Sequence, residues 1–233
     1  MVLRDFLIAP READGAHEPA RAASTGGFAL RARFGPARRG RPAAAAARAR
    51  SLGVLAGARD LPAIAIAAGV VVSRREPAAL VCVHAPGDAL PAPALRAPAR
   101  AAAARLAASV RARGLACDAR GRVAVVDLAH EHEDPAGAAA RALAAAGALP
   151  TVLGVAVRDP DLDVLLAAQD AVVVALPSSA DPTLAELATS SAARLAPRAA
   201  SIDLGLDPAS RALALAGVRA PAAVRVAIDG VVS

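Results

Sequence analysis

From Ser51 to the end of the chain, short uninterrupted apolar runs alternate with segments of helical pattern. The runs at 79–84, 151–157 and 171–176 contain almost no polar residue, which is typical of parallel strands covered on both faces. Parallel strands need crossover connections, and regular alternation with helices places those crossovers on both faces of one sheet. The sequence therefore predicts an α/β domain over residues 51–233, with a doubly wound, mostly parallel sheet.

The same pattern gives the expected elements. We expect strands at 52–57, 79–84, 122–128, 151–157, 171–176, 200–204 and 223–229. We expect helices at about 61–74, 92–113, 135–147, 160–168, 182–196 and 208–216. Between residues 114 and 128 the pattern allows either a short hairpin or a loop followed by one strand.

Four Asp-Pro pairs each follow an expected strand and precede a helical pattern. Asp accepts hydrogen bonds from the free amides of a helix start, and Pro fits the first helical position because its missing N–H costs nothing there. The four pairs therefore predict four helix starts, at Asp134-Pro135, Asp159-Pro160, Asp181-Pro182 and Asp207-Pro208. After two of them, one helix face gathers apolar residues that can pack on a sheet. These are Leu162, Leu165 and Leu166, and then Leu184, Leu187, Ala188 and Leu195.

Positive charge is concentrated in the first 50 residues. They hold ten Arg and four acidic residues, whereas residues 51–233 hold seventeen of each. Low complexity and this charge predict that residues 1–50 form a disordered, basic, Arg/Ala/Pro-rich arm. Such an arm can contact nucleic acid or an anionic membrane surface, or it can be a solvated linker.

The two cysteines indicate a reducing compartment, and the longest apolar segment near the loop is short. Cys82 and Cys117 lie 35 residues apart without a CxxC motif, so we expect buried free thiols. The twelve apolar residues 61–72 are too few to cross a bilayer, and no secretory leader is evident. We expect a cytoplasmic protein whose membrane association, if any, comes through partners.

The loop after the first expected strand reads GARDLPA and lacks most parts of a phosphate-binding loop. Such a loop needs several glycines, a lysine, and a Ser or Thr for magnesium. Here Gly57 is the one glycine, and all 27 basic residues of the chain are arginine. Pro62 has no N–H to offer, and we expect Asp60 to cap the following helix. Arg59 is the one residue of the loop that could contact an anion, and it is a poor substitute for the lysine. Because the other parts are missing, we expect no triphosphate hydrolysis.

Three stretches carry a family resemblance. They read SLGVLAGARDLPAIAIAAG, then RVAVVDLA with Asp127, then QDAVVVALPSSADPTLAELA with Asp170, Pro177 and Leu184 in order. Over about residues 51–230 the chain resembles the MinD/ParA-like branch of P-loop ATPases, in particular its divergent CpaE/TadZ-like members. The resemblance implies a P-loop NTPase-like or Rossmann-like three-layer sandwich. Both family lysines are missing, and the acid expected after the second strand is replaced near His84.

The family resemblance, together with a loop that lacks the phosphate-binding residues, implies a pseudo-ATPase. We expect a non-catalytic scaffold or regulatory protein, for the assembly or localisation of a pilus or secretion machine. It implies protein partners, among them a secretion or pilus ATPase, and a homodimer. No cofactor and no catalytic residue is expected. A vestigial nucleotide site would comprise Gly57, Arg59 and Asp127, with weak nucleotide binding left open because a strand-edge crevice remains.

A second hypothesis rests on imidazoles at expected strand ends. His84, Asp127, His130 and His132 would all lie at the carboxyl edge of a parallel sheet, where active sites form. His84, His130 and His132 are candidate ligands for zinc or iron, which would make the protein a small α/β enzyme with a metal or acid/base site. Alternatively, residues 130–134 are a polar surface loop leading to a helix cap. No GxSxG and no GxGxxG motif occurs.

Overall fold

A computed structural model describes residues 50–85, 98–131, 134–177, 180–196, 198–203 and 220–232. All of them belong to one compact unit, Ala43–Ser233. The expected arm, except Arg50, lies outside the described residues, as do His132, Asp207 and the helix expected at 208–216.

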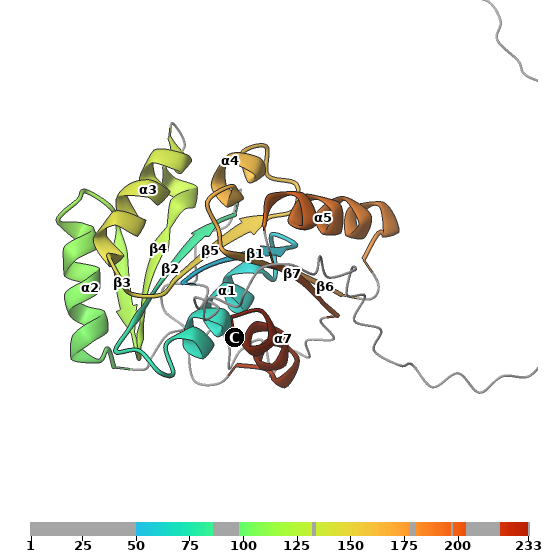
Figure 1. Cartoon of the computed structure of the whole chain (residues 1–233). Coiled ribbons are helices and arrows are strands. Elements are labelled where there is room, and N and C mark those ends of the chain that lie inside the picture. Colours follow the sequence, from blue (N-terminus) through green and yellow to red (C-terminus); the bar gives the residue numbers. More distant parts are fainter. Residues whose placement is uncertain are drawn as a thin grey trace, which may run out of the picture. The chain divides into compact units, whose positions relative to one another are not determined.

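The centre of this unit is a seven-stranded sheet (Figure 1). Its strands, in spatial order, are β3 (Cys117–Arg120), β4 (Val123–Asp127), β2 (Ala79–His84), β5 (Thr151–Ala156), β1 (Ser51–Ala56), β6 (Ala171–Leu176) and β7 (Arg198–Asp203). Only the β3–β4 pairing is antiparallel. The predicted α/β class with a mostly parallel sheet is confirmed.

Helices cover both faces of the sheet and complete a three-layer sandwich. They are α1 (Leu61–Val72), α2 (Ala101–Arg111), α3 (Pro135–Ala146), α4 (Leu162–Leu166), α5 (Pro182–Leu195) and α7 (Ala222–Val232), with a short 3₁₀ turn, η2 (Leu128–His130). In Figure 1, α1 and α7 lie on one side of the sheet and α2 to α5 on the other. Two separate apolar clusters result, one under each helical layer. No helix among the described residues has the length and apolarity needed to cross a membrane.

The connections change direction between β1 and β5, which are neighbours in the sheet. The chain leaves β1 through α1 on one face toward β2, and leaves β5 through α4 on the other face toward β6. In an open α/β sheet, a crevice forms at the carboxyl ends of strands where connections diverge in this way. The fold therefore directs attention to the segments that follow β1, β5 and their neighbour β2.

The expectation of a strand at 223–229 is wrong, because residues Ala222–Val232 form helix α7. Val224, Val226 and Ile228 alternate as in a strand, but Val224, Ile228 and Val231 also share a helical face and are buried. Val226 falls outside that face and is 74% exposed. The segment forms a helix rather than a strand because a helix buries its apolar face against α1 and the sheet.

The Asp-Pro expectations are confirmed at two sites and corrected at a third. Asp134 accepts a hydrogen bond from the Gly137 amide at 2.7 Å, and Asp181 accepts one from the Thr183 amide at 2.8 Å. Asp159 does not cap a helix, because α4 begins only at Leu162.

Two smaller expectations also need correction. Asp60 occupies the cap position of α1, yet its side chain makes no capping hydrogen bond. Leu187 is 52% exposed although Ala188 beside it is buried. Of the two alternatives for residues 114–128, the hairpin is present, since β3 pairs with β4 across a turn in which Gly121 adopts a φ of 50°.

Candidate functional site

The turn between β1 and α1 is closed by hydrogen bonds within its own backbone. The carbonyl of Gly57 accepts hydrogen bonds from the amides of Asp60 at 2.9 Å and Leu61 at 3.0 Å. The next residue, Pro62, has no amide hydrogen. Two amides that a phosphate loop would aim at a ligand are therefore bonded within the turn, and the next position offers none.

Gly57 does not use the freedom that glycine offers. Its φ lies outside the left-handed region, and a β-carbon placed on it would meet nothing within 4 Å. The turn is therefore open to any small residue, unlike a loop in which glycine permits the close approach of a phosphate.

Carboxylates dominate the segments that follow the carboxyl ends of the strands. Among the described residues of these segments, only Arg59 and Arg158 carry positive charge. From α3, Arg141 lies 3.8 Å from carboxylate oxygens of both Glu131 and Asp134 and neutralises them in part. The remaining excess of carboxylates disfavours a polyanion at this edge. The carboxylates are those of Asp60, Asp127, Glu131, Asp134, Asp159, Asp161, Asp181 and Asp203.

At this edge, His84 and Asp159 form a buried pair. His84 ends β2, Asp159 follows β5, and these two strands are neighbours in the sheet. The distance from His84 Nδ1 to Asp159 Oδ2 is 2.6 Å, and the two side chains are 13% and 0% exposed. The contact has the length of an ion pair, but neither atom makes a hydrogen bond to any described residue.

The carboxylate of Asp159 is fixed by its own loop. Its second oxygen, Oδ1, accepts a hydrogen bond from the Asp161 amide at 2.9 Å. Because Nδ1 of His84 faces Asp159, the remaining ring nitrogen, Nε2, is the atom of this pair that could meet a proton donor, an acceptor or a metal. The sequence does not predict the pair, because Asp159 followed by Pro160 indicates a helix cap. The available signal was that both residues follow apolar strands.

Asp127 lies apart from both groups. In the sheet β4 is separated from β1 by β2 and β5, three strand spacings, or about 14 Å at roughly 4.8 Å each. Asp127 is aligned with Val83, which packs under α1, so its side chain faces that layer, whereas His84 faces the opposite one. Its carboxylate accepts the amide of Ala129 at 3.0 Å and so caps η2. The structure therefore does not bring Gly57 and Asp127 together.

The proposed metal ligands are only partly described. His84 lies in the buried pair, the backbone of His130 ends η2, and His132 is outside the described residues. Within the described part of the chain, no group of three or more His, Cys, Asp or Glu side chains could hold a metal ion. A site that includes His130 and His132 stays a prediction.

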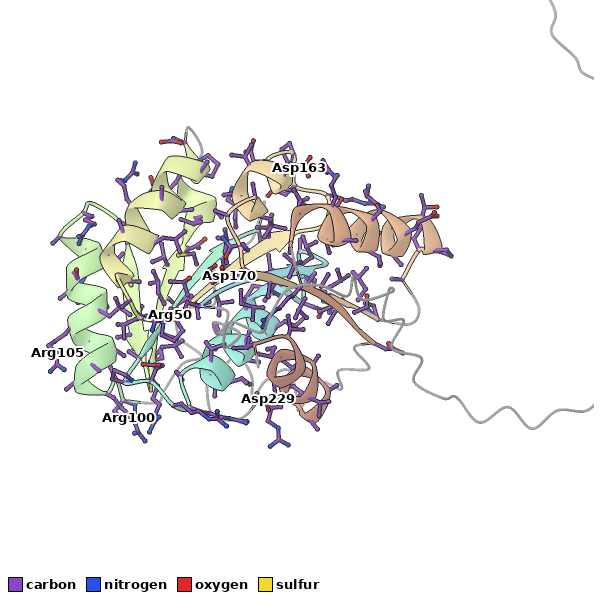
Figure 2. The ribbon with its side chains drawn as sticks, viewed as in Figure 1. Arg50, Arg100, Arg105, Asp163, Asp170 and Asp229 are labelled. Atoms are coloured by element: carbon purple, nitrogen blue, oxygen red, sulfur yellow. The ribbon has the colours of Figure 1, made fainter. Side chains whose placement is uncertain are left out.

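Asp170, which the family resemblance also singled out, lies at the opposite, amino-terminal edge and joins β6 to β1 (Figure 2). Its Oδ2 accepts hydrogen bonds from the Arg50 amide, the Ser51 amide and the Ser51 hydroxyl, at 2.9, 3.0 and 2.9 Å. Partial burial acts to raise the pKa of Asp170, but the hydrogen bonds from Ser51 and Arg50, with the charge of Arg198, lower it below the usual value. Its role is structural.

The cysteines are free and buried, as expected. Cys82 on β2 and Cys117 on β3 both align with Val126 of the strand between them, which separates them by two strand spacings. Burial, with the nearby Cys117, raises the pKa of Cys82 far above its usual value, and burial raises that of Cys117 to about 11. Neither thiol is suited to act as a nucleophile.

A groove of about 460 Å³ lies away from these residues, between α5 and strands β6 and β7. It is lined mostly by apolar side chains such as Leu176 and Pro177, with Asp203 at its polar side. None of the predicted site residues lines it.

Comparisons of the chain with protein-family models, curated proteins and solved structures find no match.

Proposed function

We propose that this protein is a non-hydrolysing scaffold, which keeps the body of a nucleotide hydrolase but not its phosphate site. The observation that carries the proposal is the turn after β1, where the Gly57 carbonyl accepts hydrogen bonds from the amides of Asp60 and Leu61. To bind a triphosphate, the turn would have to break both bonds and present amides toward an edge rich in carboxylates.

The pair of His84 and Asp159 supports the same proposal. In a hydrolase of this kind a strand-end carboxylate and the phosphate loop must lie close enough to share one magnesium ion. The strand beside β1 on this side is β5, and the carboxylate after it belongs to Asp159. That carboxylate is fully buried and already contacts His84 and the Asp161 amide, so it is not directed toward the turn after β1 as a free magnesium ligand.

The resemblance to MinD/ParA-like proteins suggests the biological setting. In this proposal the body serves as a binding partner, for example for a secretion or pilus ATPase, or for a second copy of itself. Its partners recognise the folded surface, and neither nucleotide binding nor hydrolysis switches the interaction.

The experiment is a thermal-shift measurement on the full chain with a non-hydrolysable ATP analogue and magnesium. A ligand bound only by the folded state must raise the melting temperature. We expect a change below about 1 °C at millimolar analogue, and no phosphate release above that of buffer. A magnesium-dependent rise of several degrees would overturn the proposal.

Arg59→Ala provides a matched control for a weak signal. Arg59 is the exposed cation of the turn. A small rise that persists in Arg59→Ala, and that sodium triphosphate reproduces, reports nonspecific anion binding. A rise that Arg59→Ala removes reports nucleotide at the turn and counts against the proposal.

A second candidate function is favoured by the same pair. A histidine whose Nδ1 lies 2.6 Å from a buried carboxylate, with Nε2 left over, is an arrangement that supports general acid/base chemistry or metal binding. The protein would then be a small α/β enzyme acting at the carboxyl edge.

Two measurements distinguish this enzyme from the scaffold. Stoichiometric zinc or iron in protein purified without added metal would favour the enzyme. So would hydrolysis of a nitrophenyl ester that is lost in both His84→Gln and Asp159→Asn while Arg59→Ala keeps it. Equal background rates in all variants, with no bound metal, would favour the scaffold.

A further inference from the structure

Arginines gather at the amino-terminal edge of the sheet, opposite the acidic edge. The turn before β2 contains Arg74 and Arg75, and Arg122 lies beside it, donating to the carbonyls of Ser73 and Arg74 at 3.1 Å each. The start of α2 reaches the same place, since the Arg100 amide donates to the Gly121 carbonyl at 2.7 Å. These contacts bring three separate segments together at the start of β2 and β4.

Much of this charge is not neutralised. Arg75, Arg100 and Arg105 are exposed, and none of them has an ion-pair partner among the described residues. Figure 2 shows Arg100 and Arg105 projecting outward from α2. Arg74 has one exposed partner, Asp229, at a distance of 3.8 Å. The one exposed acid in the turn itself is Glu76.

The basic N-terminal segment joins the body at this same edge. Arg50 precedes the first residue of β1, and its carbonyl accepts the Thr151 amide at the start of β5. Residues 1–50 combine ten arginines with apolar residues, among them all three phenylalanines of the chain, Phe6, Phe28 and Phe34. Arginines supply attraction to anionic lipid headgroups, and interspersed apolar side chains supply the second signal that stable membrane attachment needs.

We propose that the amino-terminal edge of the sheet binds an anionic lipid bilayer, with Arg75, Arg100 and Arg105 as its headgroup contacts. The acidic carboxyl edge then faces away from the bilayer, because a negative surface repels it. Among anionic partners, a bilayer fits the composition of residues 1–50 best, because only a bilayer offers both negative headgroups for the arginines and an apolar interior for the apolar side chains. The inference is independent of whether the turn after β1 binds nucleotide.

The test is co-sedimentation of the full chain with vesicles of equal parts phosphatidylglycerol and phosphatidylcholine, and with pure phosphatidylcholine. The test variant is Arg75→Glu/Arg100→Glu, and the matched control is Arg59→Glu/Arg158→Glu at the carboxyl edge. All four residues are exposed and both pairs change the net charge equally. Thermal melts establish that each variant is folded, and Arg105→Glu on the exposed side of α2 serves as an independent single change.

We expect binding to the anionic vesicles only, weakened by salt. Arg75→Glu/Arg100→Glu should bind roughly 30-fold more weakly and Arg105→Glu roughly fivefold, with the control pair within about threefold of the natural chain. Equal losses in test and control pairs would overturn the proposal, since they report net charge alone. So would binding to a DNA duplex without binding to the vesicles.

Discussion

The two edges of the sheet differ in what their polar groups do. At the amino-terminal edge, Asp170 and Arg122 hold neighbouring segments together through hydrogen bonds to backbone. At the carboxyl edge, where α/β proteins place their ligands, the Gly57 carbonyl bonds its own turn and Asp159 contacts His84. The comparison teaches that an edge can keep the position of an active site while its polar groups contact one another and the backbone of their own turns.

The largest effect should follow from breaking the buried pair. Asp159→Ala leaves the ring of His84 beside a cavity and removes the acceptor for the Asp161 amide, so we expect the free energy of unfolding to fall by about 2–3 kcal/mol. Urea denaturation at pH 7 measures it. A double-mutant cycle with His84→Ala should show coupling of about 1 kcal/mol, and additive losses would mean that the pair is not a unit.

Two glycines, one near each end of α1, should differ in their tolerance of alanine. A β-carbon on Gly69 would lie 2.7 Å from Cγ1 of Val123 and even closer to Val81, whereas one on Gly57 would meet nothing. We expect Gly69→Ala to lower the free energy of unfolding by about 2 kcal/mol, because overpacking outweighs the gain in helix propensity. Gly57→Ala should change it by less than about 0.5 kcal/mol. Similar urea midpoints for both variants would contradict the packing.

Asp170→Asn should weaken the amino-terminal edge in a pH-dependent way. The folded pKa of Asp170 is lowered, so its contribution is present above the unfolded pKa and is lost as the pH falls through the folded pKa. For so exposed a group we expect a loss of only about 1 kcal/mol at pH 7. Urea denaturation of both proteins from pH 7 to pH 3 should show the difference shrinking below about pH 4. A difference that stays constant would rule out the carboxylate as its source.

The smallest effect should come from a surface ion pair that belongs to neither edge's hydrogen-bond network. Arg194 on α5 contacts both carboxylate oxygens of Asp163, at 2.7 and 2.8 Å, but both side chains are more than half exposed. Asp163→Asn should therefore change the free energy of unfolding by less than about 0.5 kcal/mol. A loss above 1 kcal/mol would show that the pair couples α4 to α5 more strongly than its exposure implies.

The strand pattern was readable from sequence because buried parallel strands are continuous apolar runs. β2 and β6 have the predicted bounds, and Asp134 and Asp181 cap helices as local chemistry requires. Helix α7 was not readable, since its valines fit two periods and only burial beside α1 separates them.

The site was harder to foresee than the fold. Which strand ends are neighbours depends on strand order, and His84 and Asp159 meet only because β5 lies between β1 and β2. The sequence instead suggested Gly57 with Asp127, which the same order separates. The weakness of the phosphate loop was readable, because missing lysine and the presence of Pro62 need no tertiary information.

The most direct test follows the amides of Asp60 and Leu61 by ¹H–¹⁵N spectroscopy while magnesium and a non-hydrolysable ATP analogue are added. Both amides should be protected from hydrogen exchange by the Gly57 carbonyl, and their resonances should stay in place up to millimolar analogue. Saturable, magnesium-dependent shifts of these two resonances would contradict the claim that the turn is closed to phosphate.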